Sequence, residues 1–491
     1  MQLGELVAAI GEAQALHFRE AEVTRVVTDS RRAVEGAVFC ALAGEHANGA
    51  DFIEDAARRG AVAAITERAE QTTPLTQLVV PDARAAMRKA AWALWGRSAA
   101  AVDLAGVTGT NGKTTTVFLL RDMIEAAGLH AGVVSTMGVD LGRGVQYTGF
   151  TTPETDAVLG AIHDMHAAEM TWGVIEISSQ ALSLGRVDGL ELRAGVFTNL
   201  TRDHLDFHGT MDAYLDAKAL MFERLAPDAT AVLNRDDPAA AKLAERTRAR
   251  VLWTGLGPRC DVSVSDAGAE ASSAQPHPTR VRLSTPGGER DLDWHLAGTH
   301  NRSNLASAAG AAFAAGASLD AIASAAGAFR GVPGRLQQVD NDAGLRVLVD
   351  FAHTPEALRL VLQSLRSDAM GRIVCLFGCG GDRDATTRPL MGRIAADLAD
   401  LVVVTSDNPR TEDPDAIIAQ IMDGVRGATN VTVEADRRRA VEAALTMAKA
   451  GDTVLLAGKG HEAYQIVGDE RIPFSDAQVA AEVLGAIAKR T

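Results

Sequence analysis

Residues 106–116 read GVTGTNGKTTT, and this segment constrains the fold more than any other part of the chain. It follows an apolar stretch at 101–105, which predicts a strand, and it leads into a helical pattern at 117–127. A strand that turns tightly through glycines into a helix presents backbone N–H groups to an anion, and the helix N-terminus strengthens that field. The segment therefore predicts an α/β domain that binds phosphate.

The residues after the turn favour a nucleoside triphosphate. Lys113 is placed to reach the terminal phosphates, and the Thr114 hydroxyl is placed to ligate Mg²⁺. The common phosphate-loop pattern has a further glycine five residues before Gly112, where this chain has Val107. The alternative is a glycine turn that only caps a helix, and the Gly-Lys-Thr triplet between strand and helix argues against it.

Composition narrows the classes of function. The 491 residues carry a formal net charge of −15, which argues against a nucleic-acid binder but leaves room for a local basic cluster. The four cysteines lack zinc or CxxC spacing, which fits a reducing cytosol. Residues 1–16 lack a basic start, and the apolar stretch 308–329 carries Asp320, so we expect neither a signal peptide nor membrane insertion.

Strand and helix patterns alternate in three regions, 1–98, 99–331 and 332–491, which predicts α/β architecture throughout. Expected strands lie at 23–28, 61–65, 131–135, 172–177, 194–199, 346–350, 372–377, 401–405, 430–434 and 453–457. A meander is expected at 251–255, 261–265, 279–284 and 289–294. Expected helices lie at 51–59, 83–96, 214–222, 356–365, 389–399, 414–425, 437–450 and 476–489.

Unusual polar residues fall at or after the ends of these strands, where ligands of open α/β sheets collect. Glu176 is a plausible Mg²⁺ ligand; His204 alone would more often be a loop histidine, and Asp203 beside it a helix cap. Lys218 lies in a helical pattern, and chemistry alone predicts a solvated surface lysine. In 298–304, which precedes an Ala-rich helix, the asparagines suit an adenine edge, with helix capping as the alternative.

The third region carries further polar runs. An acid at the end of a strand, as in 350–355, can bind a ribose hydroxyl, with capping as the alternative. Arg383 and the run 407–410 are suited to hold a carboxylate, because arginine binds one through two parallel hydrogen bonds. The run 458–462 is similar to a second phosphate loop without its Ser or Thr, and Glu462 would face a cation. An ordinary surface loop is the alternative for each.

Taken together, the runs 109–115, 199–209, 378–384, 407–410 and 458–462 make the chain resemble the Mur ligase family. The motifs fall in the family's order from Asp29 to Glu462, so the resemblance covers nearly the whole chain. It implies three domains: an N-terminal domain for the UDP substrate at 1–98, a central P-loop ATPase-type domain at 99–331, and a C-terminal Rossmann-like domain for the amino acid at 332–491.

The resemblance also implies a reaction in peptidoglycan precursor synthesis. With ATP and Mg²⁺, a cytoplasmic, monomeric enzyme phosphorylates the D-Glu side chain of UDP-N-acetylmuramoyl-L-alanyl-D-glutamate. An amine of meso-2,6-diaminopimelate then displaces phosphate. The alternatives are a lysine-adding or folylpolyglutamate-type ligase of the same superfamily, and a nucleotide switch that ligates nothing.

Family positions carry over to individual residues of this chain. Catalytic positions match Lys113, Glu176, His204, Lys218, Asp350 and His353. The metal positions match Thr114, Glu176, His204 and Lys218, whose amine the family carries as a CO₂-derived carbamate, which overrides the surface reading. ATP positions match Gly109, Thr110, Asn111, Gly112, Lys113, Thr114, Thr115, Asn301, Asn304 and Arg335. UDP-substrate positions match Ser30, Glu45, His46, Thr151, Thr152, Ser178 and Arg186. Diaminopimelate positions match Arg383, Asp407, Asn408, Pro409, Arg410, Gly458 and Glu462.

The preference for diaminopimelate rests on the run 407–410. Arg410 can fork onto the far carboxylate of this amino acid, and Glu462 can pair with its ammonium. Lysine lacks that carboxylate and would leave Arg410 unpaired. Three residues depart from the family pattern and put single contacts in doubt: Phe351 where Tyr is common, Leu184 where a polar residue is frequent, and Gln180 in place of His.

Overall fold

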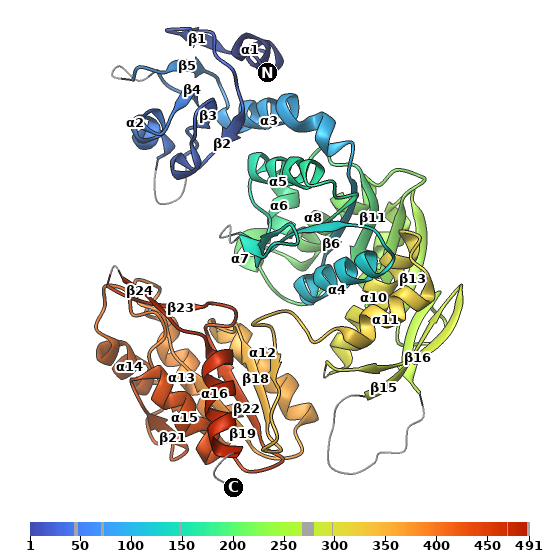
Figure 1. The fold of residues 1–491 in the computed structure, drawn as a ribbon, viewed down its shortest axis with the longest axis vertical. Coiled ribbons are helices and arrows are strands. Elements are labelled where there is room, and N and C mark those ends of the chain that lie inside the picture. The colour runs from blue at the N-terminus through green and yellow to red at the C-terminus, as the bar shows by residue number, and fades with distance from the viewer. Residues whose placement is uncertain are drawn as a thin grey trace. The chain divides into compact units, whose positions relative to one another are not determined.

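The computed structural model describes residues 1–43, 48–69, 73–146, 150–267, 279–296, 298–468 and 470–488. The chain divides into two compact units. Figure 1 labels the helices and strands of both. The first unit comprises Met1–Ser265, Arg282–Leu292 and Ser303–Ala326, and the second comprises Asp266–Val281, Asp293–Arg302 and Gly327–Thr491. Each unit is described by itself.

The first unit begins with a five-stranded sheet in the order β1-β5-β4-β3-β2. β1 is antiparallel to β5, and the other neighbours are parallel. The sheet is Ala- and Val-rich, and the long helix α3 packs Met87, Ala90 and Ala91 into the same core as Val38 and Ile65. The elements are α1 (Leu3–Ile10), β1 (Gln14–Leu16), β2 (Arg25–Val27), β3 (Ala37–Cys40), α2 (Ile53–Arg58), β4 (Ala61–Thr66), β5 (Thr76–Val79) and α3 (Ala83–Ala99).

An eleven-stranded sheet follows, in the order β16-β15-β14-β13-β12-β11-β6-β10-β7-β8-β9. β6, which leads into the phosphate loop, lies between β10 and β11 and is parallel to both. The strands are β6 (Asp103–Thr108), β7 (Ala131–Ser135), β8 (Gly138–Asp140), β9 (Val145–Gln146), β10 (Trp172–Glu176), β11 (Leu192–Phe197), β12 (Thr230–Asn234), β13 (Arg250–Gly255), β14 (Val262–Asp266), β15 (Thr279–Thr285) and β16 (Gly288–Trp294). The helices are α4 (Lys113–Ala126), α5 (Thr155–Ala167), α6 (Ser179–Ser183), α7 (Leu205–His208), α8 (Met211–Glu223), α9 (Ala239–Arg246), α10 (Thr299–Ala314) and α11 (Leu319–Ala328).

The second unit holds a six-stranded sheet in the order β17-β18-β22-β19-β20-β21. β17 is antiparallel to β18 and the remaining neighbours are parallel, so the loops after β18, β19, β20 and β22 emerge at one edge. The elements are β17 (Gln337–Val339), β18 (Arg346–Asp350), α12 (Pro355–Asp368), β19 (Ile373–Phe377), α13 (Thr387–Leu398), β20 (Leu401–Val404), α14 (Pro414–Asp423), β21 (Val431–Val433), α15 (Arg437–Met447), β22 (Thr453–Ala457), the hairpin β23 (Tyr464–Val467) and β24 (Glu470–Pro473), and α16 (Asp476–Ala488).

The α/β class expected from the sequence is confirmed, and three expected strands coincide with β7, β18 and β22. The expected meander is wrong at its first step, because Thr254 and Gly255 of β13 pair in parallel with the start of β14. The expectation that 298–304 precedes a helix is also wrong: α10 starts at Thr299 and contains Asn301 and Asn304. No helix among the described residues is long and apolar enough to cross a membrane.

Candidate functional site

The phosphate loop is a four-residue turn between β6 and α4. β6 runs to Thr108, so Val107 lies inside the strand and the chain needs no glycine there. Gly109 and Gly112 have φ of 150° and 82°, where other residues are strained. A Cβ on Gly109 would collide with Thr198, and one on Gly112 would collide with the Asn304 side chain. The loop is therefore closely packed as well as tightly turned.

A second loop, which follows β11, braces the phosphate loop. The Thr110 N–H donates to the Asn199 carbonyl at 2.8 Å, and the Asn111 N–H donates to Asn199 Oδ1 at 2.9 Å. Thr198 Oγ1 donates to the Asn111 carbonyl at 2.6 Å. These bonds link the ends of adjacent parallel strands, so they hold the loop in a shape fixed by the sheet. Sequence reasoning gave Thr198 and Asn199 no such role.

Lys113 lies over its own loop. Its Nζ donates to the carbonyls of Gly109 at 3.1 Å and Thr110 at 2.8 Å. The ammonium is thus held at the mouth of the turn, within reach of a bound anion. This placement fits the terminal phosphate of a nucleotide.

Glu176 ends β10 and is almost fully buried beside the phosphate loop. Its Oε2 accepts hydrogen bonds from Thr114 Oγ1 at 3.0 Å and from the Thr136 N–H at 3.0 Å, with Thr136 Oγ1 at 3.1 Å. A carboxylate and a hydroxyl are the hard oxygen donors that Mg²⁺ prefers. The pair Thr114 and Glu176 therefore fits a magnesium ion. Thr136 is a third member of this cluster that the sequence did not single out.

Lys218 is buried on α8, with 1% of its surface exposed, and lies beside the same turn. Its Nζ donates to the Gly109 carbonyl at 2.8 Å and lies 4.4 Å from the centre of the Tyr214 ring. Burial, with a smaller contribution from Lys113, holds the pKa of Lys218 well below its ordinary value. The expectation of a surface lysine, drawn from chemistry alone, is wrong, because Lys218 lies on the buried face of α8 together with Tyr214 and Phe222.

His204 follows β11 at the start of α7. It is exposed, has a left-handed backbone with φ of 51°, and its Nε2 lies 3.6 Å from Asp203 Oδ2. No cluster of three His, Cys, Asp or Glu side chains able to hold a metal occurs among the described residues. The oxygens of a bound nucleotide and water would thus have to complete any magnesium site. The role of His204 stays a prediction.

The UDP-substrate positions in the central region meet around Glu154. Arg186 donates to Glu154 Oε1 at 3.1 Å and to the Thr152 carbonyl at 3.1 Å. Thr152 Oγ1 donates to the Glu176 carbonyl at 2.7 Å and accepts from the Ser178 N–H at 3.0 Å. Thr151 Oγ1 lies 3.0 Å from Thr136 Oγ1. The predicted substrate residues therefore connect directly to the predicted metal site through Glu176.

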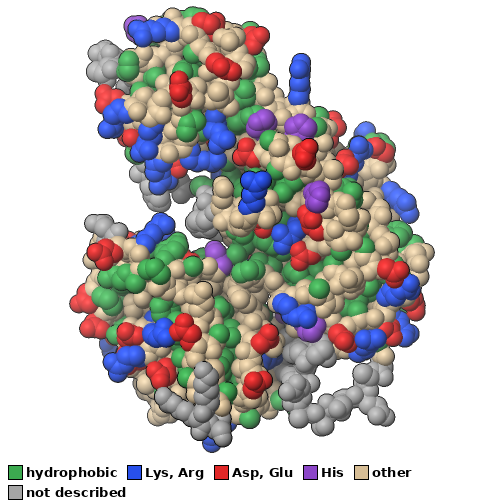
Figure 2. All heavy atoms as spheres, in the orientation of Figure 1, with side chains coloured by type: hydrophobic (Ala, Val, Ile, Leu, Met, Phe, Trp, Pro, Cys, Tyr) green, Lys and Arg blue, Asp and Glu red, His purple; other side chains and the backbone are tan. Residues whose placement is uncertain are grey.

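The N-terminal sheet carries a cavity of about 680 Å³. Ser30 lies in its wall, where its hydroxyl donates to Asp55 at 2.8 Å. The wall also holds Arg31, paired with Asp29, and Arg58, paired with Asp55, so its arginines are balanced by carboxylates. Figure 2 shows several Lys and Arg side chains over this part of the first unit. Glu45 and His46, which were also expected here, lie outside the described residues.

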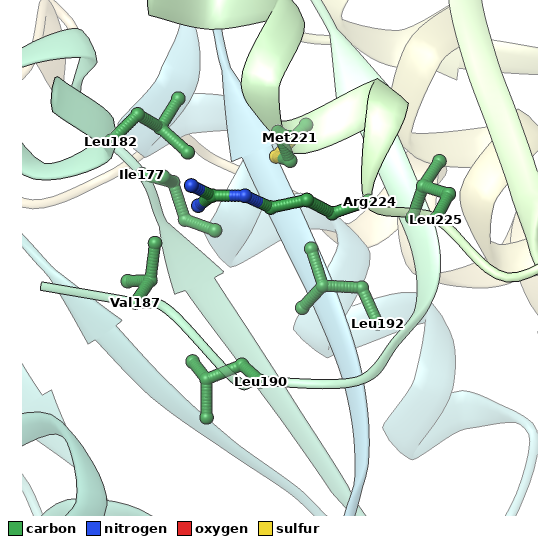
Figure 3. A pocket seen from close by; sticks show the side chains of 8 residues that line it. All are labelled: Ile177, Leu182, Val187, Leu190, Leu192, Met221, Arg224 and Leu225. Atoms are coloured by element: carbon green, nitrogen blue, oxygen red, sulfur yellow. The ribbon is translucent and has the colours of Figure 1, made fainter. Parts of the chain in front are cut away.

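A much smaller cavity, about 20 Å³, lies between the loop after β10 and helix α8 (Figure 3). Leu182, Val187, Leu192 and Met221 line it, and the Arg224 side chain lies across it. Arg224 pairs with Asp188 at 2.5 Å. The cavity is apolar packing behind the site and offers nothing to a charged substrate.

In the second unit, Asp350 ends β18 and is buried. Its carboxylate accepts the N–H groups of Leu336 and Ala352, each at 2.8 Å. Burial raises its pKa, and the nearby Arg335 opposes that rise. Arg335 lies 5.5 Å from the centre of the Phe351 ring, and the exposed His353 lies 4.5 Å from the same ring. The ring of Phe351 thus contacts both Arg335 and His353, and neither contact needs the hydroxyl that a tyrosine would carry at this position.

The loops after β20 and β22 form a charged cluster. Asn408 Nδ2 donates to Glu462 Oε2 at 2.8 Å, and the buried Lys459 donates to Asn408 Oδ1 at 3.0 Å and to Glu462 Oε2 at 3.1 Å. The backbone of Gly458, with φ of 111°, packs against Asp407, so a side chain there would collide with the carboxylate. Glu462 is therefore already held by a cation, Lys459, which the sequence did not single out.

Asp407 lies beneath this cluster. It is 7% exposed, and its Oδ2 lies 3.7 Å from Arg437 Nη1. Arg437 and Asp476 are both fully buried and form a two-bond ion pair at 2.9 and 2.7 Å, and Arg437 also donates to the carbonyls of Ser406 and Ala457. This network fixes the ends of β20 and β22 from below. The expectation that Asp407 contacts an amino acid directly remains a prediction.

Arg410 lies between two loops with its backbone in the left-handed region, at φ of 52°. Its Nη1 donates to the Gly381 carbonyl at 2.6 Å, and its N–H donates to the Ile466 carbonyl at 3.1 Å. Pro409 packs against Gly381, where a Cβ would collide with the Pro409 carbonyl. Arg383, two residues further along the loop, is exposed. Arg383, Asn408, Arg410, Gly458 and Glu462 thus belong to three loops at one edge of this sheet.

Three models of Mur ligase domains match consecutive parts of the chain. They are described as the Mur ligase family catalytic domain, matching residues 22–93, the Mur ligase middle domain, matching 107–312, and the Mur ligase glutamate ligase domain, matching 334–460. The matched segments contain most strands of the three sheets described above; β1 and the start of β6 lie outside them. They cover most of the chain.

Curated relatives match over nearly the full length. A protein of Gloeobacter violaceus named UDP-N-acetylmuramoyl-L-alanyl-D-glutamate–2,6-diaminopimelate ligase is 42% identical over 488 residues, covering 99% of this chain and 98% of its own. A protein of Solibacter usitatus with the same name is 40% identical, with the same coverage.

Solved structures agree in fold. A structure with that same ligase name is 33% identical, covers 95% of both chains and has a TM-score of 0.62. A MurF ligase from Thermotoga maritima in complex with ADP is 20% identical, covers 96% of this chain and 99% of its own, and has a TM-score of 0.64. At that identity the second likeness shows the fold alone.

Proposed function

This chain belongs to the Mur ligase family, and we propose that it joins meso-2,6-diaminopimelate to UDP-N-acetylmuramoyl-L-alanyl-D-glutamate at the expense of ATP. The observation that carries this proposal is the full-length likeness to ligases of that name. The phosphate loop of the first unit supports it, as does the position of Arg410, Asn408 and Glu462 in loops at one edge of the second unit's sheet. The product is a peptidoglycan precursor.

The first step activates an acid. A carboxylate oxygen of the D-Glu side chain attacks the γ-phosphorus of ATP, ADP leaves, and an acyl phosphate forms. The backbone N–H groups of the loop and Lys113 would hold the phosphates, and Thr114 with Glu176 would hold Mg²⁺. Bound Mg²⁺ would supply charge neutralisation for the transferring group.

The second step forms the amide. An amine of diaminopimelate attacks the acyl carbon, the tetrahedral intermediate collapses, inorganic phosphate leaves with the C–O bonding pair, and the nitrogen loses a proton. Arg410 would fork onto the far carboxylate of the amino acid and Glu462 would receive its far ammonium. We assign nucleotide-side and catalytic roles to Asp350 and His353 on the family pattern.

We also propose that Lys218 is carbamylated. Only a neutral amine adds to CO₂, and burial beside the phosphate loop keeps this amine neutral at a pH where exposed lysines are charged. A carbamate would add a carboxylate-like group next to Lys113 and Thr114. We further propose a monomer in the cytoplasm, to which the four free cysteines are suited.

The test measures ADP release with ATP, Mg²⁺ and UDP-N-acetylmuramoyl-L-alanyl-D-glutamate, with meso-diaminopimelate or L-lysine as the amino acid. We expect ADP and a tripeptide product mass only with diaminopimelate. Equal turnover with lysine would support the lysine-adding alternative, and hydrolysis that needs no amino acid would support a nucleotide switch.

A further inference from the structure

The two loops that carry Arg410 and Arg383 are joined by a chain of polar contacts to which no role has yet been given. It consists of Asp382, Arg388, Thr411 and Glu412, and we call it the loop clamp. Arg388 lies at the start of α13, Glu412 follows Arg410, and Asp382 lies in the loop after β19. The clamp thus crosses between the loops that follow two neighbouring strands.

At the base of the clamp, Arg388 and Glu412 form a two-bond ion pair. Arg388 Nη1 donates to Glu412 Oε2 and Nη2 donates to Oε1, each at 2.8 Å. The Arg388 side chain is only 1% exposed, and it also donates to the Gly380 carbonyl at 3.1 Å and to Gln420 at 2.8 Å. A buried guanidinium with this many partners has a fixed position.

Above this pair, the two loops are bonded to one another. The Asp382 N–H donates to Glu412 Oε1 at 2.6 Å, and Thr411 Oγ1 donates to Asp382 Oδ1 at 2.6 Å. Asp382 has a left-handed backbone with φ of 54°, which costs about 1–2 kcal/mol and persists only where neighbours hold it. Each loop is therefore held in a strained shape by the other.

Arg410 takes its position from this arrangement. Its guanidinium is tied to the carbonyl of Gly381, the residue before Asp382, and its backbone precedes Thr411 and Glu412. Moving either loop would move the guanidinium or break that bond. A two-bond contact to a carboxylate tolerates little displacement, since both hydrogen bonds must be aligned at once.

We propose that Arg388 and Glu412 are positioning residues that set the preference for diaminopimelate by fixing the fork of Arg410. This inference rests on the proposed function. The clamp touches no substrate itself; it holds the group that does.

The test is Glu412→Gln, which preserves size but removes the charge and one acceptor. We expect the KM for meso-diaminopimelate to rise about tenfold, as for the loss of one hydrogen bond to a charged group. The KM values for ATP and for the UDP substrate should stay within about twofold, because the clamp holds a residue assigned to the amino acid alone. A tenfold change in either would correspond to a loss of about 1.4 kcal/mol of binding free energy. Thr411→Val, an exposed and nearly isosteric change, should shift the same KM in the same direction and by less.

Asp452→Asn is the matched control. Asp452 also forms a two-bond pair with an arginine, Arg372, and accepts the backbone N–H groups of Arg372 and Lys449. It precedes β22, so it lies at the opposite edge of the sheet from the clamp. We expect this variant to lose stability and to keep its KM for diaminopimelate.

The clamp would be ruled out by equal changes in all three KM values in Glu412→Gln, or by a diaminopimelate KM that rises as much in Asp452→Asn. Failure of the wild-type enzyme to use diaminopimelate would instead reject the proposed function. If Glu412→Gln does not fold, Thr411→Val decides, and an unchanged diaminopimelate KM there overturns the inference.

Discussion

The amine of Lys218 is almost fully buried, and its partners are the Gly109 carbonyl and the Tyr214 ring. A charged lysine in such a place would lose most of its hydration, which these two contacts offset only in part, so the pKa of Lys218 is lowered and the neutral amine is favoured. The neutral amine also differs in reactivity from the ammonium, because its nitrogen keeps a lone pair and can act as a nucleophile. If Lys218 is carbamylated as proposed, its burial would prepare this amine to attack CO₂ beside the phosphate loop.

Replacing Lys218 by Ala should lower kcat about 10²–10³-fold, the range for removing one charge-stabilising group. Added bicarbonate should not restore activity, because no amine remains to react. A ¹³C NMR carbamate signal under ¹³CO₂ should be present in the wild type and absent in this variant. Lys242→Ala, at an exposed position on the next helix, should behave as the wild type. Normal turnover by Lys218→Ala would refute the carbamate.

Arg410→Lys should raise the KM for diaminopimelate about 10–100-fold, because the ammonium of lysine cannot make two parallel bonds to a carboxylate and loses about 1.5–3 kcal/mol. Steady-state kinetics with the amino acid varied would measure this. Arg393→Lys, at an exposed pair with Asp397 on α13, is the control. An unchanged KM would mean that Arg410 does not contact the substrate.

Among the elements, the phosphate loop shows which features the local sequence predicts and which depend on packing between distant segments. Glycines at 109 and 112, followed by Lys and Thr, predicted a turn into a helix, and α4 begins at Lys113. The bracing by Asn199 and the contact of Gly112 with Asn304 were not predicted, because they join segments about 90 and 190 residues apart. The local sequence pattern predicts single helices and strands. Which residues of distant segments contact one another depends on the order of the strands in the sheet, which the local pattern does not contain.

Gly112→Ala should weaken ATP binding by about tenfold or more, because it adds a left-handed strain of about 1–2 kcal/mol and a collision with Asn304. Gly128→Ala is a close control: its φ is also 82°, it lies just beyond the other end of α4, and a Cβ there meets nothing within 4 Å. Titration of both variants with a fluorescent ATP analogue tests this. Equal losses of affinity would show that backbone strain alone matters.

At the scale of the whole molecule, the succession of three α/β sheets was predictable, and the positions of several strands were not. The strands β3, β5 and β12 were not predicted. Each is short, and its sequence lacks a clear alternation of apolar and polar residues. Clusters within a sheet edge were partly predictable: Asn408 and Glu462 do meet, yet Lys459, which bonds to both, was assigned no role of its own. A lysine's partner depends on which carboxylate the fold brings near, which spacing does not reveal.

Burial also makes the stability of the first unit depend on pH. Asp156 on α5 is 2% exposed, accepts the N–H of Thr28 at 3.0 Å, and has its pKa raised from 3.8 to about 6, mainly by desolvation. Because the folded pKa exceeds the unfolded one, this group contributes stability that is fully present below pH 3.8 and is lost as pH rises through about 6. The full difference amounts to ~3 kcal/mol.

Asp156→Asn should remove this term. The unfolding free energy of the wild type minus that of the variant should therefore fall by about 2 kcal/mol between pH 4 and pH 7. Urea unfolding followed by tryptophan fluorescence would measure it, and Asp164→Asn, at a more exposed site on the same helix, should give a flat difference. A flat difference for Asp156→Asn as well would contradict the raised pKa.

The buried pair of Arg437 and Asp476 has a consequence for the order in which the second unit folds. Asp476 begins α16 and lies 39 residues after Arg437 in the chain. Arg437 holds the ends of β20 and β22 through the Ser406 and Ala457 carbonyls, but an unpaired guanidinium cannot be buried there. Until α16 has packed, Arg437 lacks the carboxylate of Asp476. The loops that follow β20 and β22 therefore take their final shape late in the folding of the second unit, after α16 has docked.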